Sequence, residues 1–250
     1  MKKDDQQHIS CNFTIGCKQG GFGPGCKNCC AIEVIVKLSG KKSPVAEIAK
    51  QVIHKVDGKW QWNGVIKENP YAYRFLRNQN KDICIIATYC GECALASENA
   101  LREFFWMVYA NPKSKFVLLT KLPALLYDKV KKLKPDLFKY GIKVDKLKNL
   151  RIATSVENNE KKFRINQLAK FKCLGFTRLD VWFKPLLENI VNVDLTGIKS
   201  IRINVEKGKY KRCHEVFWID LLSKQAVKQG VKVYYDFEKH ELNKPTRRNK

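Results

Sequence analysis

Short runs of apolar residues recur along the chain, and longer stretches with apolar residues at helical spacing lie between them. Seven of these runs are rich in Ile, Val, Phe and Tyr, which favour strands, and their length is that of buried strands. They are residues 8–15, 82–88, 115–120, 150–156, 176–183, 198–205 and 231–237. The pattern predicts seven strands.

Four stretches between the strands carry helical spacing together with signals for helix ends. They are residues 97–112, 123–133, 158–171 and 215–230. Ser97 is a suitable N-cap, Pro123 suits the first turn of a helix, and Gly230 suits a C-cap. Strands that alternate with helices predict an α/β fold with a parallel sheet and right-handed crossovers.

About seven strand–helix units in 250 residues suit a full or partial parallel β/α barrel, and an open doubly wound sheet is the alternative. Residues 41–80 break this rhythm. In that stretch, residues 43–56 read as a helix and residues 57–66 as a hairpin, so we interpret it as an insertion. The sequence predicts a single domain over residues 1–237, followed by a basic, disordered tail over residues 238–250.

The charge of the chain narrows the class of partner. Lys and Arg number 48 against 24 Asp and Glu, which gives a net charge of +24. Such a surface attracts polyanions, of which nucleic acid or a nucleotide is the first expectation, and a generally basic protein is the alternative. No apolar run approaches the length of a membrane span, and no secretory signal follows the first residues. We therefore expect a cytoplasmic protein without membrane association, whose thiols stay reduced.

Ten cysteines supply the candidate chemistry. Cys17, Cys26 and Cys29 have the spacing C-x8-C-x2-C on a glycine-rich loop. Three thiolates leave one position open on a four-iron cluster, whereas structural zinc takes four ligands. A [4Fe-4S] cluster, a zinc ion and an unliganded loop are the three interpretations. Cys90 and Cys93 form a C-x2-C pair that could complete a four-cysteine zinc site.

Five blocks along the chain resemble the motifs of a phage and bacterial family of unknown function, often described as three-Cys-motif, radical-SAM-like proteins. They are CNFTIGCKQGGFGPGCKNCCA, FVLLTKLPALL, LRIATSVENN, FKPLLENI and INVEKGKYKRCH, and they keep the family's order over most of residues 10–237. The chain departs from the motifs at Cys11 to Phe13, Cys30, Lys184 and Asn204 to Val205. The resemblance therefore identifies it as a divergent member.

The resemblance implies a radical SAM-type barrel. Cys17, Cys26 and Cys29 would hold three irons of a [4Fe-4S] cluster, and S-adenosylmethionine would chelate the fourth and yield a 5'-deoxyadenosyl radical. Further site residues follow from the same comparison. Cofactor contacts are expected from Gly91, Glu92, Ser155 and Glu157, and catalytic roles from Lys121, Glu157, Arg212 and His214.

Two functions follow from these observations. The first is a radical SAM-like iron–sulfur enzyme that acts on nucleic acid or a nucleotide. The alternative is a non-catalytic nucleic-acid-binding protein with a structural four-cysteine zinc or cluster site.

Overall fold

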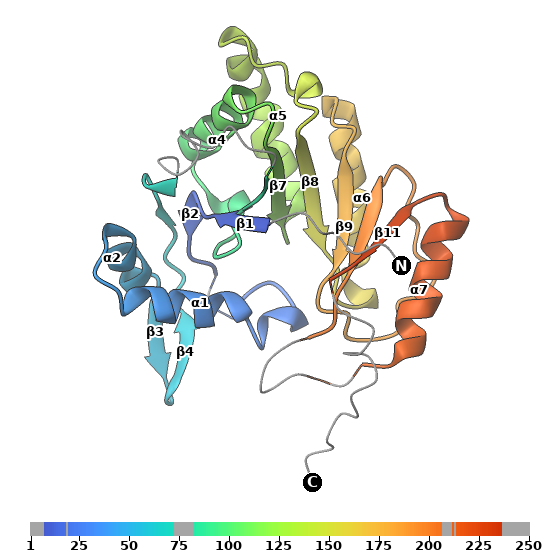
Figure 1. Ribbon diagram of the computed structural model, residues 1–250, viewed down its shortest axis with the longest axis horizontal. Helices are drawn as coiled ribbons and strands as arrows, with labels where there is room; N and C mark the ends of the chain where they lie inside the picture. The colour runs from blue at the N-terminus through green and yellow to red at the C-terminus, as the bar shows by residue number, and fades with distance from the viewer. Residues whose placement is uncertain (1–7, 19, 73–82, 207–211, 213, 237–250) are drawn as a thin grey trace.

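The computed structural model describes residues 8–18, 20–72, 83–206, 212 and 214–236. Its centre is a seven-stranded sheet in which every neighbouring pair is parallel (Figure 1). The strands are, in sheet order, β1 (His8–Cys11), β6 (Cys84–Ala87), β7 (Lys115–Thr120), β8 (Leu150–Ser155), β9 (Leu179–Phe183), β10 (Ser200–Ile203) and β11 (Lys232–Tyr235). Within the described chain, β1 and β11 do not pair, so the sheet is open and no closed barrel forms.

The strand order follows the chain order without a reversal. A doubly wound sheet would place its first strand in the middle, so this alternative is wrong. The helices α4 (Glu98–Ala110), α5 (Pro123–Lys139), α6 (Phe163–Ala169) and α7 (Val216–Lys228) each follow a strand, and Figure 1 shows them around the outside of the sheet. The predicted parallel β/α arrangement is confirmed at this level.

Helix-end chemistry sets several of the observed bounds. The Ser97 hydroxyl accepts a hydrogen bond from the Ala100 amide at 3.1 Å, and Gly230 follows α7 with a φ of +71°. Both predicted caps are therefore in place. The helix predicted to end at residue 133 instead continues through Pro135 to Lys139.

The predicted insertion contains a helix and a hairpin, with shifted bounds. α2 (Pro44–Gln51) ends earlier than predicted, and the residues after it form β3 (Ile53–Val56), which pairs with β4 (Lys59–Trp62). Asp57 and Gly58, at φ values of +47° and +76°, make the tight turn between them. The sequence reading missed β3 because its two apolar residues, Ile53 and Val56, have a spacing that also fits the end of a helix.

The first predicted strand is interrupted in the structure. β1 ends at Cys11, and after two residues β2 (Thr14–Ile15) pairs with β5 (Lys67–Glu68) instead of joining the central sheet. Phe13, at the break, is buried and stacks on Phe104 of α4 at 5.1 Å between ring centroids. The chain therefore leaves the sheet at Phe13 and enters the loop that carries the first cysteines.

Three hydrophobic clusters of described residues hold this arrangement, and the smallest joins Cys84, Val117, Ala153 and Trp182 of the central strands. The large one fills the space between the sheet and its outer helices, and a smaller one joins β2, β3 and β4 to α2 and α1 (Cys30–Ser39). The described residues contain no helix that is both long and apolar enough to cross a membrane. The predicted tail and residues 73–80 of the insertion lie outside the described residues.

Candidate functional site

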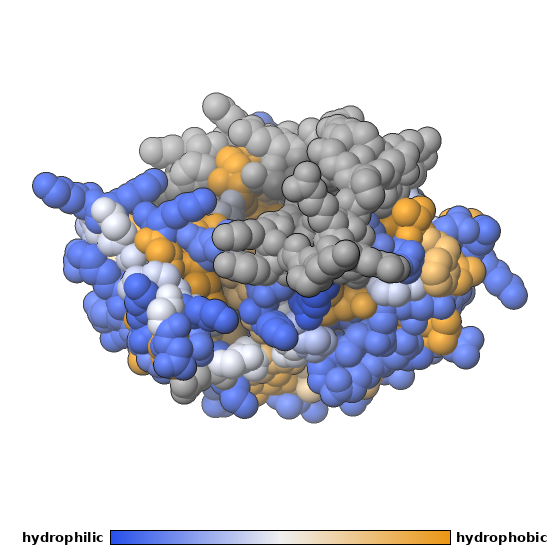
Figure 2. Space-filling view, turned by 90° about the horizontal axis from the view of Figure 1, so that it is seen from below, coloured by the Kyte–Doolittle hydropathy of each residue, from blue (hydrophilic) through white to orange (hydrophobic). Residues whose placement is uncertain are grey.

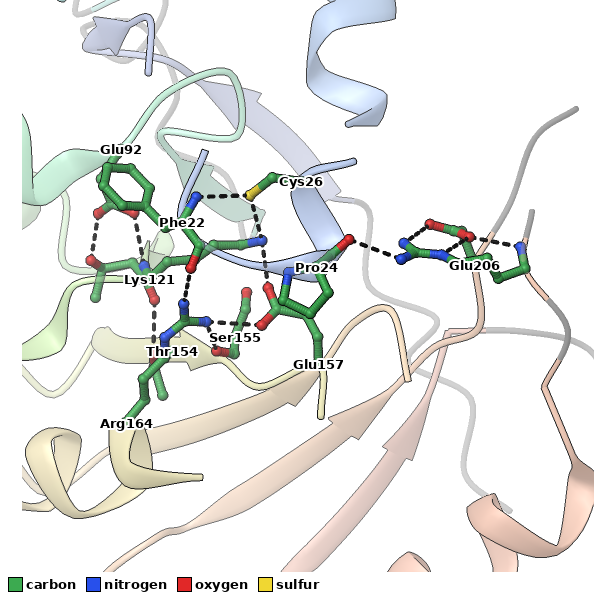
Figure 3. Close-up of polar contacts among 12 residues, drawn as sticks. Phe22, Pro24, Cys26, Glu92, Lys121, Thr154, Ser155, Glu157, Arg164 and Glu206 are labelled. Atoms are coloured by element: carbon green, nitrogen blue, oxygen red, sulfur yellow. Dashed lines mark hydrogen bonds and ion pairs between the residues drawn. The ribbon is translucent and has the colours of Figure 1, made fainter. Parts of the chain in front are cut away.

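The cysteine loop, residues 16–29, lies across the carboxyl ends of the strands. It begins after β2 and leads into α1. Arg164 Nη2, on α6, donates to the Phe22 carbonyl at 2.7 Å, and Arg212 Nη1, beyond β10, donates to the Pro24 carbonyl at 3.0 Å (Figure 3). The loop is therefore held between the β8 and β10 ends of the sheet, where α/β proteins place their functional groups.

Two glycines let this loop pack closely. Gly21 has a φ of +74°, and a Cβ there would overlap the Cβ of Cys26. A Cβ at Gly25 would lie 2.7 Å from Cγ of Glu157. Gly21 is thus required both by the turn and by the close approach of Cys26, and Gly25 by the close approach of Glu157.

The three predicted ligand thiols lie together and are partly buried. Cys26 Sγ accepts hydrogen bonds from the Phe22 amide and from Lys121 Nζ, both at 3.3 Å. Burial, together with the nearby Glu92, Cys26 and Cys29, raises the pKa of Cys17 to about 12. Burial likewise raises the pKa of Cys29, with a smaller contribution from Cys26. Bound cations would supply the positive charge that such grouped thiolates need.

The arrangement of these thiols bears on what they could bind. Among the described residues, no three His, Cys, Asp or Glu side chains are arranged to hold one metal ion. A four-iron cluster spreads its thiolates over several irons and does not gather them around one ion. Donors to Cys26 are also the contacts expected around metal-bound sulfur. That Cys17, Cys26 and Cys29 hold an iron–sulfur cluster stays a prediction.

Cys90 and Cys93 do not lie in one group. Cys90 is buried in the small cluster with Cys17 and Cys29, whereas Cys93 is buried in the large core, where its Sγ contacts the Leu119 carbonyl at 3.3 Å. Burial raises the pKa of Cys90 to about 12, with further contributions from Cys29 and Cys30. Only Cys90 of this pair therefore lies near the cysteine loop.

A buried carboxylate joins the loop to two cations. Glu157 is fully buried, and its two oxygens lie 2.5 Å from Lys121 Nζ and 2.9 Å from Arg164 Nη1. Burial opposes the charge on Lys121, but Glu157 and Cys26 raise its pKa above the usual value. Lys121 is therefore a fixed cation whose ammonium group contacts Cys26 (Figure 3).

Arg164 is a site residue that the sequence reading missed. It is buried, and besides Glu157 it contacts the carbonyl of Ser155, at the end of β8, at 2.8 Å. The only signal in the sequence was an arginine among the apolar positions of a short helix, where a solvated side chain was equally plausible. Asn12 was also missed. Its Oδ1 accepts from the Cys90 amide at 2.7 Å and so joins the two cysteine-bearing loops.

Gly91 and Glu92 connect neighbouring loops in the structure. Gly91 bridges to Gly16, and a Cβ on Gly91 would lie 2.8 Å from the Thr14 carbonyl oxygen. The Glu92 carboxylate accepts from the Thr120 hydroxyl, from the Lys121 amide at 2.8 Å and from the Ala94 amide at 3.1 Å. Burial raises the pKa of Glu92 although these donors lower it. The cofactor contact predicted for both residues stays a prediction.

Arg212 pairs with Glu206 beyond the end of β10. Arg212 donates to Glu206 from Nη2 at 2.5 Å and from Nε at 2.9 Å. Burial alone would raise the pKa of Glu206, but the hydrogen bonds from Arg212 hold it below its ordinary value. His214 is half-buried and lies just before α7. The structure thus joins Lys121, Glu157 and Arg212 to the cysteine loop, and catalytic roles for them and His214 stay predictions.

A comparison of the whole sequence with protein families gives one match. The family described as "Protein of unknown function (DUF5131)" matches residues 5–249, which include every candidate site residue. Neither the curated proteins nor the solved structures contain a match to the chain.

Proposed function

Because this chain belongs to DUF5131, a family of unknown function, we propose its function from the site: a radical SAM-like iron–sulfur enzyme that acts on nucleic acid or a nucleotide. One observation carries the proposal. Three cysteines of one loop lie together across the carboxyl ends of a parallel β/α sheet whose strands follow the chain order. An open sheet of this kind is compatible with the partial β/α barrel that the strand–helix pattern predicts.

Cys17, Cys26 and Cys29 would hold three irons of a [4Fe-4S] cluster, and the fourth iron would be open to S-adenosylmethionine. Bound together, these cofactors supply one-electron chemistry that no side chain of the protein provides. The protein would bind and orient these cofactors and shield them from water. The burial of Cys17 and Cys29 supports that role.

Lys121 has a specific part in this proposal. Its ammonium group donates to Cys26 Sγ, and Glu157 and Arg164 hold it there. A fixed cation beside a thiolate stabilises the deprotonated form that metal binding requires. Lys121 would therefore favour metal loading and tune the electron affinity of the site through its contact with Cys26.

Anaerobic reconstitution tests the proposal directly. Iron and sulfide are counted, and the spectrum of the reduced protein is recorded with and without S-adenosylmethionine. We expect four irons per chain, as the proposed [4Fe-4S] cluster requires, and a spectrum that shifts when S-adenosylmethionine is added. Zinc alone, or a cluster indifferent to S-adenosylmethionine, would refute the proposal.

A further inference from the structure

The positive charge of the chain is concentrated in one segment. Residues 128–178 hold fifteen Lys and Arg against five Asp and Glu, so ten of the 24 net charges lie in about a fifth of the sequence. The segment contains most of α5, the connection to β8, and α6 with the turn after it. These elements are neighbours in space, since α5 contacts α6 and the turn that follows it.

The lysines of this segment face the solvent because apolar residues between them are buried. Leu133 and Leu137 fix the inner side of α5, and Ile142, Val144 and Leu147 fix the connection that follows it. The exposed lysines are Lys131, Lys132, Lys134, Lys139, Lys143, Lys146, Lys148, Lys170 and Lys172. We name the surface that carries these lysines the α5 face.

Large aromatic rings are exposed on the same face. The exposed fractions are 62% for Phe138 and 67% for Tyr140, and Lys143 Nζ lies 5.7 Å from the centre of the Phe138 ring. Both α4 and α5 run antiparallel to the strands, so they are parallel to each other. Arg102 of α4 lies 3.7 Å from Asp136 of α5. Trp106, one turn further along α4, is 53% exposed.

We propose that the α5 face binds the backbone of a nucleic-acid strand. The inference rests on the proposed function and narrows its substrate from a nucleotide to a polymer. Lysines would neutralise phosphates, and the exposed rings would stack on unpaired bases.

The dimensions of the α5 face favour a polymer. The 17 residues of α5 span about 25 Å, which corresponds to roughly seven phosphates along one strand of a duplex. A single nucleotide contacts only a small part of that length. The helix begins at Pro123, two residues after Lys121, so a strand that continued from the α5 face along the first turns of α5 would reach the edge of the sheet that carries the cysteine loop.

Three lysines without an ion pair among the described residues provide the test. The variant Lys131→Gln/Lys143→Gln/Lys148→Gln is compared with the control Lys224→Gln/Lys228→Gln, whose lysines are exposed on α7. The full-length chain is titrated against labelled single-stranded and duplex oligonucleotides over a range of salt concentrations. We expect the slope of log K against log salt to fall by about two to three in the triple variant and by under one in the control.

The rings separate single-stranded from duplex binding. We expect Phe138→Ala/Tyr140→Ala to weaken single-strand binding by about tenfold and duplex binding by less, because only unpaired bases stack on side chains. The matched control is Phe217→Ala on α7, whose ring is 53% exposed. Circular dichroism and a thermal melt verify that each variant is folded.

Three outcomes would overturn the inference. They are equal salt slopes for the triple variant and the α7 control, competition by a mononucleotide at equal phosphate concentration, and lysine-dependent binding of anionic vesicles in place of oligonucleotides. None of them concerns the cluster, because the titration needs no catalysis. If the titration excludes nucleic-acid binding by the α5 face but the cluster responds to S-adenosylmethionine, the proposed chemistry stands. The search for a substrate then turns to nucleotides.

Discussion

Glu157 shows how single residues hold the site together. It is fully buried, and its two oxygens are shared between Lys121 and Arg164. A buried carboxylate that loses a partner keeps its desolvation cost without the compensating attraction. The stability of the folded site therefore depends on the buried ion pairs of Glu157, which lie beside the cysteines.

Replacing Arg164 tests this arrangement. We expect Arg164→Met to lower the free energy of unfolding by about 3–5 kcal/mol, since it leaves Glu157 with one partner fewer in the interior. The control is Lys132→Met, which breaks the exposed pair with Glu98 and should cost about 1 kcal/mol or less. Urea denaturation measures both, and equal small effects would show that Arg164 contributes no more than a surface charge.

Glu92 predicts a dependence of stability on pH. Its pKa is raised in the folded protein, mainly by burial, from an ordinary value of 4.5. Its folded form therefore binds more protons than its unfolded form, so its contribution to stability is complete below that value and is lost as pH rises through the raised pKa. We expect Glu92→Gln to remove the part of the loss of stability with rising pH that Glu92 causes.

The measurement compares urea midpoints of the two proteins between pH 5 and pH 8. The midpoint of the wild-type protein should fall relative to that of Glu92→Gln as the pH rises. The exposed Glu98→Gln variant should follow the wild type. Parallel curves for wild type and Glu92→Gln would contradict the assignment.

At the scale of elements, the cysteine loop depends on glycine geometry. Gly20 and Gly21 both have positive φ, at +72° and +74°, but only a Cβ on Gly21 would meet Cys26. We expect Gly21→Ala to lose most of the bound iron, because the methyl group displaces a predicted ligand. Gly20→Ala has the same backbone strain and an open neighbourhood, so it should retain iron. Equal iron contents after reconstitution would mean that strain alone decides the outcome.

The elements were largely predictable because each carries its own local pattern. The seven central strands are short apolar runs, and the ends of α4 and α7 are set by Ser97 and Gly230. β3 was missed because its pairing with β4 depends on the turn at Asp57 and Gly58, whereas the reading assigned residues 43–56 to a helix and began the hairpin at residue 57. Local periodicity gives no information about such a partner.

At the scale of the whole molecule, long-range contacts decide which cysteines meet. The sequence offered two C-x2-C pairs, and the fold brings Cys90 but not Cys93 toward the cysteine loop. We expect Cys90→Ser/Cys93→Ser to retain iron after reconstitution, and Cys26→Ser to lose it. Loss of all metal in the double variant would instead support the four-cysteine alternative. Cys173→Ser, at an exposed thiol, controls for the general effect of replacing cysteine.

Part of the site was predictable because some of its residues directly follow strands. Lys121 and Glu157 follow strands β7 and β8, so the parallel sheet places them at one edge. Arg164 and Asn12 act through partners on other loops, and the Phe22 carbonyl that Arg164 binds is 142 residues away in sequence. No spacing rule covers such a contact, since it exists only once several crossovers have been formed.

The anchoring of the cysteine loop also determines where the chain can be lengthened. Arg164 and Arg212 hold the carbonyls of Phe22 and Pro24, which are separated by one residue. Two hydrogen bonds so close together fix the backbone between them. A residue inserted there would therefore break the hydrogen bond between one arginine and its carbonyl. The exposed turn at Asp57 and Gly58 joins only β3 and β4. An affinity tag or a fluorescent label belongs in that turn, where it reports on the molecule without stretching the loop.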